Sequence, residues 1–289
     1  PSSNVLRLLG TLVFFGASLV AWALSSPAGS APDGDYHLAT IWCGAGERAG
    51  QCERSPEGID GSPMVPRGLL RYAGPLSHFC FVGNPGASAG CLSALDGGAV
   101  ATMESTGRLD RALTTSPFSE TLEVFVGRDV ESSVLKMRLF NVGLMLIVWG
   151  LVICMAPRIG EVLGLLWLCL GVPLGTYFVP SAHPHSWVFI FMVAGFVSLY
   201  LALTVEALVS VLRRVALFGV AAAEIGLAVA ARPTDTTVFA VLVVIVASIR
   251  RVQQATQRSR QLRLLVLALI GSVALAVIEG AFGGVTDLW

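Results

Sequence analysis

The stretch Pro32-Asp33-Gly34-Asp35-Tyr36-His37 comes shortly after an apolar run, Val5–Leu24. The apolar run has about the 20 residues that an α-helix needs to cross a bilayer. Two carboxylates and one imidazole are therefore predicted to lie at a membrane surface. Proline is tolerated in the first turn of a helix, so the sequence predicts a short surface helix over about Pro32–Cys43. Within such a helix, Asp33 and His37 would share a face.

Val5–Leu24 is interpreted as a membrane-spanning helix that the protein retains. Its apolar core is long for a signal peptide, in which the apolar region has about 7 to 15 residues. Ala23, Ser25 and Ala28 are small residues that would suit a cleavage site, so a signal peptide is the alternative. A retained helix would hold the acidic stretch at a fixed distance from the membrane.

Composition indicates that the chain as a whole belongs in a membrane. Its 289 residues are 54% hydrophobic and only 13% charged, which departs far from the composition of soluble globular domains. Acidic and basic residues balance to a formal net charge of zero, so nothing favours nucleic acid as a partner. The expected partner is the lipid bilayer.

Six further apolar runs bring the predicted number of membrane-spanning helices to seven. These runs are Leu135–Ala156, Ile159–Val179, Trp187–Ala207, Val215–Ala231, Val238–Ile249 and Leu264–Phe282. The predicted fold class is an all-α integral membrane protein with a long extracytoplasmic loop between its first two helices. The predicted domains are a transmembrane helix (1–24), an extracytoplasmic loop with a juxtamembrane helix (25–137), and a six-helix transmembrane bundle (138–289).

Arginine placement sets the predicted orientation. Arg7, Arg158, Arg213–Arg214 and the basic loop Arg250–Arg263 fall on one side of the membrane if there are seven spans. Cytoplasmic loops are enriched in lysine and arginine. We therefore predict a multi-pass protein of the cytoplasmic (inner) membrane with a cytoplasmic N-terminus. The long loop and the loop Pro180–Ser186 would then lie outside.

Four cysteines fall in the predicted outer loop: Cys43, Cys52, Cys80 and Cys91. Disulfides form outside the cytoplasm, and closeness in sequence favours the pairs Cys43–Cys52 and Cys80–Cys91, although other pairings stay open. Zinc is the competing interpretation. It is the weaker one, because no Cys-x-x-Cys pair is present and the gaps between cysteines are irregular.

Polar side chains gather on the predicted outer face: Asp33, Asp35, His37, Arg138, Asn141, His183, His185, Arg232 and Asp235. A carboxylate there could act as a general base on a hydroxyl group, and arginines could bind a phosphate. Simpler roles are a helix cap for Asp33, a snorkelling side chain for Arg138, and solvated loop residues for His183 and His185. The spacing of the three histidines gives no support to a metal site.

Glu224 lies near the middle of the predicted span Val215–Ala231, where a charged group is costly. Two interpretations stay open. One is a functional carboxyl, for example the proton carrier of a transporter, although no repeat between the halves supports a transporter. The other is a protonated or hydrogen-bonded glutamate that packs against a neighbouring helix.

The stretch after the first predicted helix matches a known motif in part. Pro32, Asp33 and His37 occupy three positions of the pattern Pro-Asp-Glu-x-x-His, in which Gly34 replaces the second acid. Asp35 is the next residue that could supply that acid.

Three later motifs follow in order. Arg138 and Asn141 match Arg-x-x-Asn at the start of the second helix, and Ala230–Arg232 match an Ala-Arg turn. Ala182–Trp187 keep the proline, serine and aromatic residue of an Asn-Pro-Ser-type turn, but lack its asparagine. Together these motifs resemble a family of bacterial polytopic proteins of unknown function within the GT-C glycosyltransferase superfamily, whose members are usually longer. The predicted fold is therefore GT-C-like.

The resemblance implies an enzyme that moves a sugar from a polyprenyl-phosphate donor to a polysaccharide acceptor of the cell envelope. Asp33 is the first choice for the base that deprotonates the acceptor hydroxyl, and Asp35 is the second. His37 would orient the base or contact phosphate. The donor would be bound by Arg138, Asn141 and Arg232. The lipid-linked donor is the only cofactor implied, a divalent metal being compatible with it, and the Gly- and Arg-rich composition suggests an actinobacterial source.

The alternative is a non-catalytic accessory or scaffold subunit. It would bind a membrane protein partner through the outer loop. The missing acid at Gly34 and the short chain favour it.

Overall fold

The structure, a computed structural model, describes residues 3–26, 31, 33–54, 63–66, 69, 103–106, 109, 114–155, 174–204 and 211–233. It contains two compact units, Pro1–Ile190 and Phe191–Trp289, each described by itself. Several predictions lie outside the described residues: the spans Val238–Ile249 and Leu264–Phe282, most of Ile159–Val179, the basic loop Arg250–Arg263, and Cys80, Cys91 and Asp235.

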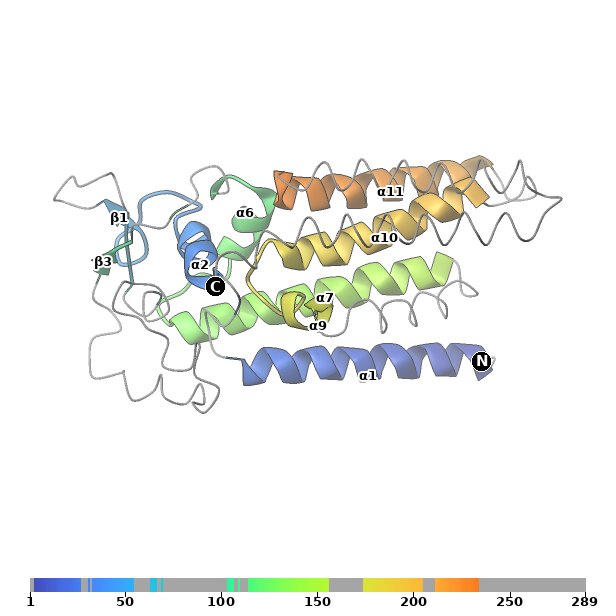
Figure 1. Ribbon diagram of the computed structural model, residues 1–289, viewed down its shortest axis with the longest axis horizontal. Coiled ribbons are helices and arrows are strands. Elements are labelled where there is room, and N and C mark those ends of the chain that lie inside the picture. The colour runs from blue at the N-terminus through green and yellow to red at the C-terminus, as the bar shows by residue number, and fades with distance from the viewer. Residues whose placement is uncertain are drawn as a thin grey trace, which may run out of the picture. The chain divides into compact units, whose positions relative to one another are not determined.

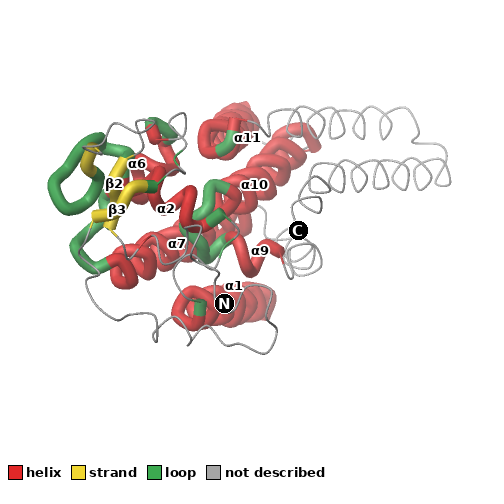
Figure 2. The backbone as a smooth tube through the Cα atoms, turned by 60° about the vertical axis from the view of Figure 1, so that its left-hand side comes forward, coloured by secondary structure: helices red, strands yellow, loops and turns green. Residues whose placement is uncertain are grey.

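The first unit is mainly helical and contains one small sheet (Figures 1 and 2). Its helices are α1 (Ser3–Ser25), α2 (Gly34–Trp42), α6 (Pro117–Glu123), α7 (Val130–Met155), α9 (Leu174–Phe178) and the first residues of α10 (His185–Thr204). The strands β1 (Glu53–Arg54), β2 (Pro63–Pro66) and β3 (Met103–Ser105) form an antiparallel sheet in that order. Met64 in the central strand pairs with Glu53 and with Ser105.

Helices α1 and α7 run antiparallel, as two contacts show (Figure 1). The Arg138 guanidinium donates to the backbone carbonyls of Ala23 and Ser26 at the end of α1. Further along, Gly16 lies against Leu146, such that a Cβ on residue 16 would be 3.0 Å from Leu146 Cδ1. Residue numbers fall along one helix as they rise along the other. The start of α7 therefore lies beside the end of α1.

The apolar helices follow the sequence pattern closely. Within the described residues, three helices are long and apolar enough to cross a membrane: Val130–Ile153, His185–Leu203 and Arg214–Ala231. Gly10–Ser25 is a shorter apolar helix. α7 begins at Val130, five residues before the predicted start at Leu135, because Asp129 caps it. The Asp129 side chain accepts from the Ser132 N–H at 3.3 Å, as an N-cap residue does.

Helix α6 begins at a serine that caps it. Ser116 caps the helix by accepting from the Ser119 N–H at 3.2 Å, and Pro117 follows in the first turn. Both residues suit a helix start. Phe118 and Leu122 are fully buried, and α6 packs against α2. These contacts attach α6 to α2.

The second unit contains the rest of α10 and α11 (Val211–Ala231). The two helices approach closely at Gly195, where an added Cβ would lie 2.8 Å from Ile225 Cγ1. One helical turn away, Ser198 Oγ donates to Glu224 Oε2 at 2.9 Å. Glu224 is therefore hydrogen bonded and packed against a neighbouring helix, as one of its two interpretations proposed.

Candidate functional site at the end of α1

Asp33 stands immediately before α2, in left-handed backbone with φ 51° and ψ 23°. Aspartate is one of the few residues other than glycine that adopts this conformation readily. Its exposed side chain makes no capping hydrogen bond to the helix. The prediction of a face shared with His37 assumed that both residues lie in the helix. Asp33 instead precedes it, while His37 is buried within it. The Asp35 side chain lies outside the described residues.

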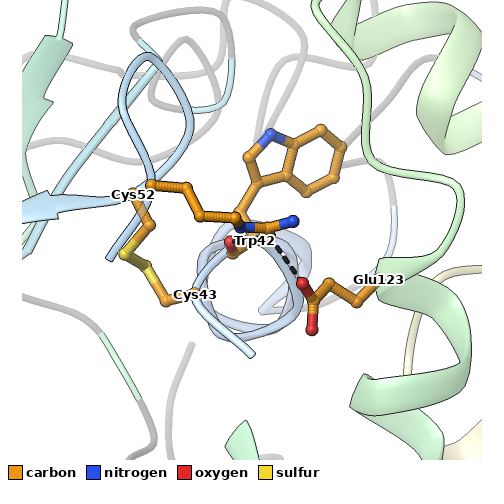
Figure 3. Close-up of polar contacts among 5 residues, drawn as sticks. Trp42, Cys43, Cys52 and Glu123 are labelled. Carbon is orange, nitrogen blue, oxygen red and sulfur yellow. Dashed lines mark hydrogen bonds and ion pairs between the residues drawn. A yellow bond between two sulfur atoms is a disulfide. The ribbon is translucent and has the colours of Figure 1, made fainter. Parts of the chain in front are cut away.

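The C-terminal end of α2 is held by a disulfide and an arginine (Figure 3). Cys43 forms a disulfide with Cys52. Between them, Arg48 Nη2 donates to the Trp42 carbonyl at 3.0 Å and lies 2.7 Å from Glu123 Oε1 of α6. A guanidinium at a helix C-terminus is favourable, since it meets unpaired carbonyls and the negative end of the helix dipole. α2 therefore has a fixed end.

Glu123 sits in a partly buried position beside this arginine. Burial raises the pKa of the Glu123 carboxyl, and the Arg48 guanidinium partly counteracts this rise. Gly44 leaves the space that the carboxylate occupies, because a Cβ there would lie 2.8 Å from Glu123 Oε2. Sequence analysis missed this ion pair. Its two residues lie far apart in the chain, and no local spacing signals it.

Three histidines meet where α2 approaches the turn between α9 and α10. The rings of His37 and His183 are 4.2 Å apart between centroids, and those of His183 and His185 are 4.7 Å apart and stacked. His37 is 6% exposed and His183 is 3% exposed. The interpretation of His183 as a solvated loop residue is therefore wrong, because α2 and the ring of Phe178 cover it.

The His183–His185 pair is held together within the turn between α9 and α10. The backbone N–H of His185 donates to His183 Nδ1 at 3.1 Å. The Nδ1 atoms of the two rings are 3.0 Å apart, so the two imidazoles lie within hydrogen-bond distance of each other.

The Asn141 side chain of α7 holds this turn through three hydrogen bonds. Its Nδ2 donates to the Ser181 carbonyl at 2.7 Å and to Ser186 Oγ at 3.2 Å, and its Oδ1 accepts from Trp187 Nε1 at 3.1 Å. Its side chain is fully buried. Both amide donors and the acceptor are thus occupied by protein. Ser181 was not predicted, and the sequence offered no sign that its carbonyl would meet Asn141.

Arg138 lies one helical turn before Asn141 and is also buried. Its hydrogen bonds to Ala23 and Ser26 close the end of α1, where carbonyls lack partners within the helix. Arg138 therefore links α7 to the end of α1, and Asn141 links α7 to the turn between α9 and α10 that carries His183. His37, Arg138, Asn141, His183 and His185 all lie in the first unit, and their place on the outer face stays a prediction.

Arg232 follows α11 in the second unit, where its backbone N–H donates to the Ala228 carbonyl at 3.2 Å. Its predicted role beside the donor phosphate stays a prediction. Within the described ranges, no group of three or more His, Cys, Asp or Glu side chains is arranged to hold a metal ion.

These helices define a predominantly helical membrane protein. A family model described as "Predicted membrane protein (DUF2142)" matches residues 15–282. The chain therefore belongs to this family, whose function is unknown. No curated protein and no solved structure matches the chain.

Proposed function

We propose that this chain is a GT-C-type glycosyltransferase, or the N-terminal module of one, in the cytoplasmic membrane. It would move a sugar from a polyprenyl-phosphate donor to a cell-envelope acceptor on the outer face. Asp33 would take the proton of the acceptor hydroxyl, with Asp35 as the second candidate. The hydroxyl oxygen would attack the anomeric carbon as the bond to the lipid phosphate breaks.

One observation carries the proposal. Helix α2, which Asp33 directly precedes, packs through His37 on a polar turn that α7 holds through Asn141. An acceptor hydroxyl that reached Asp33 beside this turn could lose its proton to the carboxylate. Arg138 and Asn141 lie one helical turn apart on α7. Their hydrogen bonds to protein indicate that they support the site, and direct donor contact is not needed for that role.

The test is sugar transfer by the purified full chain in lipid nanodiscs. Polyprenyl-phosphoryl arabinose and polyprenyl-phosphoryl mannose, radiolabelled in the sugar, would be the donors, with cell-envelope polysaccharide as the acceptor. Asp33→Asn is the informative variant, since asparagine also adopts left-handed backbone, and it should reduce transfer by about 10² to 10⁴-fold.

The matched control is Glu47→Gln. Glu47 is an exposed carboxylate that pairs only with the exposed Arg54 at 2.9 Å among the described contacts, and its loss should leave transfer unchanged. If Asp33→Asn and Asp35→Asn both transfer at the wild-type rate, neither aspartate is the base. A wild-type chain that transfers neither sugar would remove the support for a transferase.

A non-catalytic accessory subunit is the second candidate. The observation in its favour is that Arg138, Asn141 and His183 are buried and hydrogen bonded to the protein itself. A photo-reactive residue at the exposed Val124 should then cross-link to one membrane protein in intact cells. That result, combined with absence of sugar transfer, would favour this function.

A further inference from the structure

We propose that Glu224 binds an exchangeable proton inside the membrane, and that the contact between α10 and α11 is locked only while that proton is bound. The site is independent of the proposed transferase. Its ligand is a proton on one buried carboxyl group, and its structural partner is the Ser198 hydroxyl.

The position of Glu224 makes its charge costly. It is the tenth residue of the apolar segment 215–231, and it is 8% exposed. A charged residue at the centre of a membrane-spanning helix is costly. A single hydrogen bond from a neutral hydroxyl replaces only part of the hydration that a carboxylate loses on burial.

Among the contacts of the described residues, no cation pairs with Glu224. Apart from Glu224, the segments 191–204 and 215–231 contain no Asp, Glu, His, Lys or Arg. The basic residues inside the other predicted spans are Arg7, Lys136 and Arg138, all within four residues of a span end. Glu224 is therefore expected to be neutral. The Ser198 O–H donates to Oε2, which leaves the proton on Oε1.

Close packing around Glu224 couples its protonation to the contact between α10 and α11. Gly195 brings α10 against α11 so closely that an added Cβ would lie 3.3 Å from Glu224 Cβ and 3.3 Å from the Ile225 backbone nitrogen. Small residues and a polar contact at one crossing are typical of membrane helix pairs. A carboxylate formed in this buried crossing is costly, so deprotonation must weaken the contact or move the carboxyl toward solvent.

Dicyclohexylcarbodiimide tests the bound proton in the full chain in nanodiscs. This apolar reagent adds to a protonated carboxyl, takes up its proton and rearranges to an N-acylurea, which peptide mass spectrometry detects. We expect labelling of Glu224 at neutral pH that falls by roughly tenfold for each pH unit above its titration midpoint. Glu224→Gln should abolish it. A Glu224 peptide that stays unlabelled even at acidic pH overturns the proposal.

The thermal unfolding midpoint tests the lock without any reagent. Glutamine keeps the oxygen that accepts from Ser198 but cannot ionise, so Glu224→Gln should fold and hold its midpoint as pH rises. The wild type should lose stability over the same range, because the folded state binds the proton more tightly than the unfolded state. Wild-type and Glu224→Gln midpoints that change in parallel with pH overturn the proposal, whatever the labelling shows.

Discussion

At the residue scale, Asn141 holds the turn between α9 and α10 through three hydrogen bonds. Replacing it with leucine, a side chain of similar shape, removes three hydrogen bonds and strands the Ser181 carbonyl in a buried place. A buried polar group without a partner costs about 1 to 3 kcal/mol. We expect the free energy of unfolding to fall by about 2 to 4 kcal/mol, measured by tryptophan fluorescence in detergent micelles.

Gly143→Ala is the control for this change. It lies two residues further along α7, and an added Cβ there meets nothing within 4 Å. Its free energy of unfolding should equal that of the wild type or exceed it slightly, since alanine favours helix over glycine. An Asn141→Leu chain as stable as the wild type would show that other contacts hold the turn between α9 and α10.

Glu123 gives the protein a pH dependence outside the membrane. Its raised pKa means that the folded state binds the proton more tightly than the unfolded state, so stability is lost as pH rises through that pKa. Arg48→Met keeps much of the apolar stem but removes the opposing charge. The thermal midpoint of this variant should therefore fall more steeply than that of the wild type as pH rises above the ordinary pKa of a glutamate carboxyl. Two parallel curves would show that the ion pair has no influence in solution.

At the scale of elements, the packing of α1 on α7 depends on one glycine. Gly16→Val places methyl groups against Leu146, whose Cδ1 would be only 3.0 Å from the new Cβ. Gly10→Val is the matched control on the same helix, because an added Cβ there meets nothing within 4 Å. Overpacking costs about 1 to 3 kcal/mol, so the thermal midpoint of Gly16→Val should lie below that of Gly10→Val. Equal midpoints would mean that the helices do not pack there.

The helices themselves were predictable, because a long apolar run leaves few alternatives. The predicted spans at 5–24, 135–156, 187–207 and 215–231 overlap α1, α7, α10 and α11. The start of α2 was missed by two residues, since the left-handed Asp33 that precedes the helix has no signal beyond the residue type. The burial of His183 could not be predicted either. It depends on α2, which lies far away in sequence.

At the scale of the whole molecule, the orientation is open to a direct test. Alkaline phosphatase inserted after the exposed Ala45 should be active in cells, because we predict that this segment faces outward. Green fluorescent protein inserted after Gln257, in the basic loop, should fluoresce in the cytoplasm. The opposite result would place Asp33 on the inner face, away from any outer acceptor, and would contradict the transferase. The Cys43–Cys52 disulfide agrees with an outer location.

Sequence alone indicated membrane residence, and membership of a membrane protein family agrees with it. The spacing of Arg138 and Asn141 also indicated that they lie one helical turn apart. In the structure Arg138 contacts the end of α1, and Asn141 contacts the turn between α9 and α10. What those residues do was not predictable. A buried arginine that closes a helix end and one that binds a phosphate have the same sequence pattern, and only the identity of the atoms they contact distinguishes them.

The bond from Arg138 to Ala23 joins residues 115 positions apart, and this has a consequence for biosynthesis. A ribosome adds roughly 5 to 20 residues per second, so α1 emerges several seconds before the arginine that completes its end is made. In that interval the last carbonyls of α1 must be satisfied by water or by another protein. A nascent chain arrested before Arg138 would therefore leave these carbonyls without their guanidinium partner.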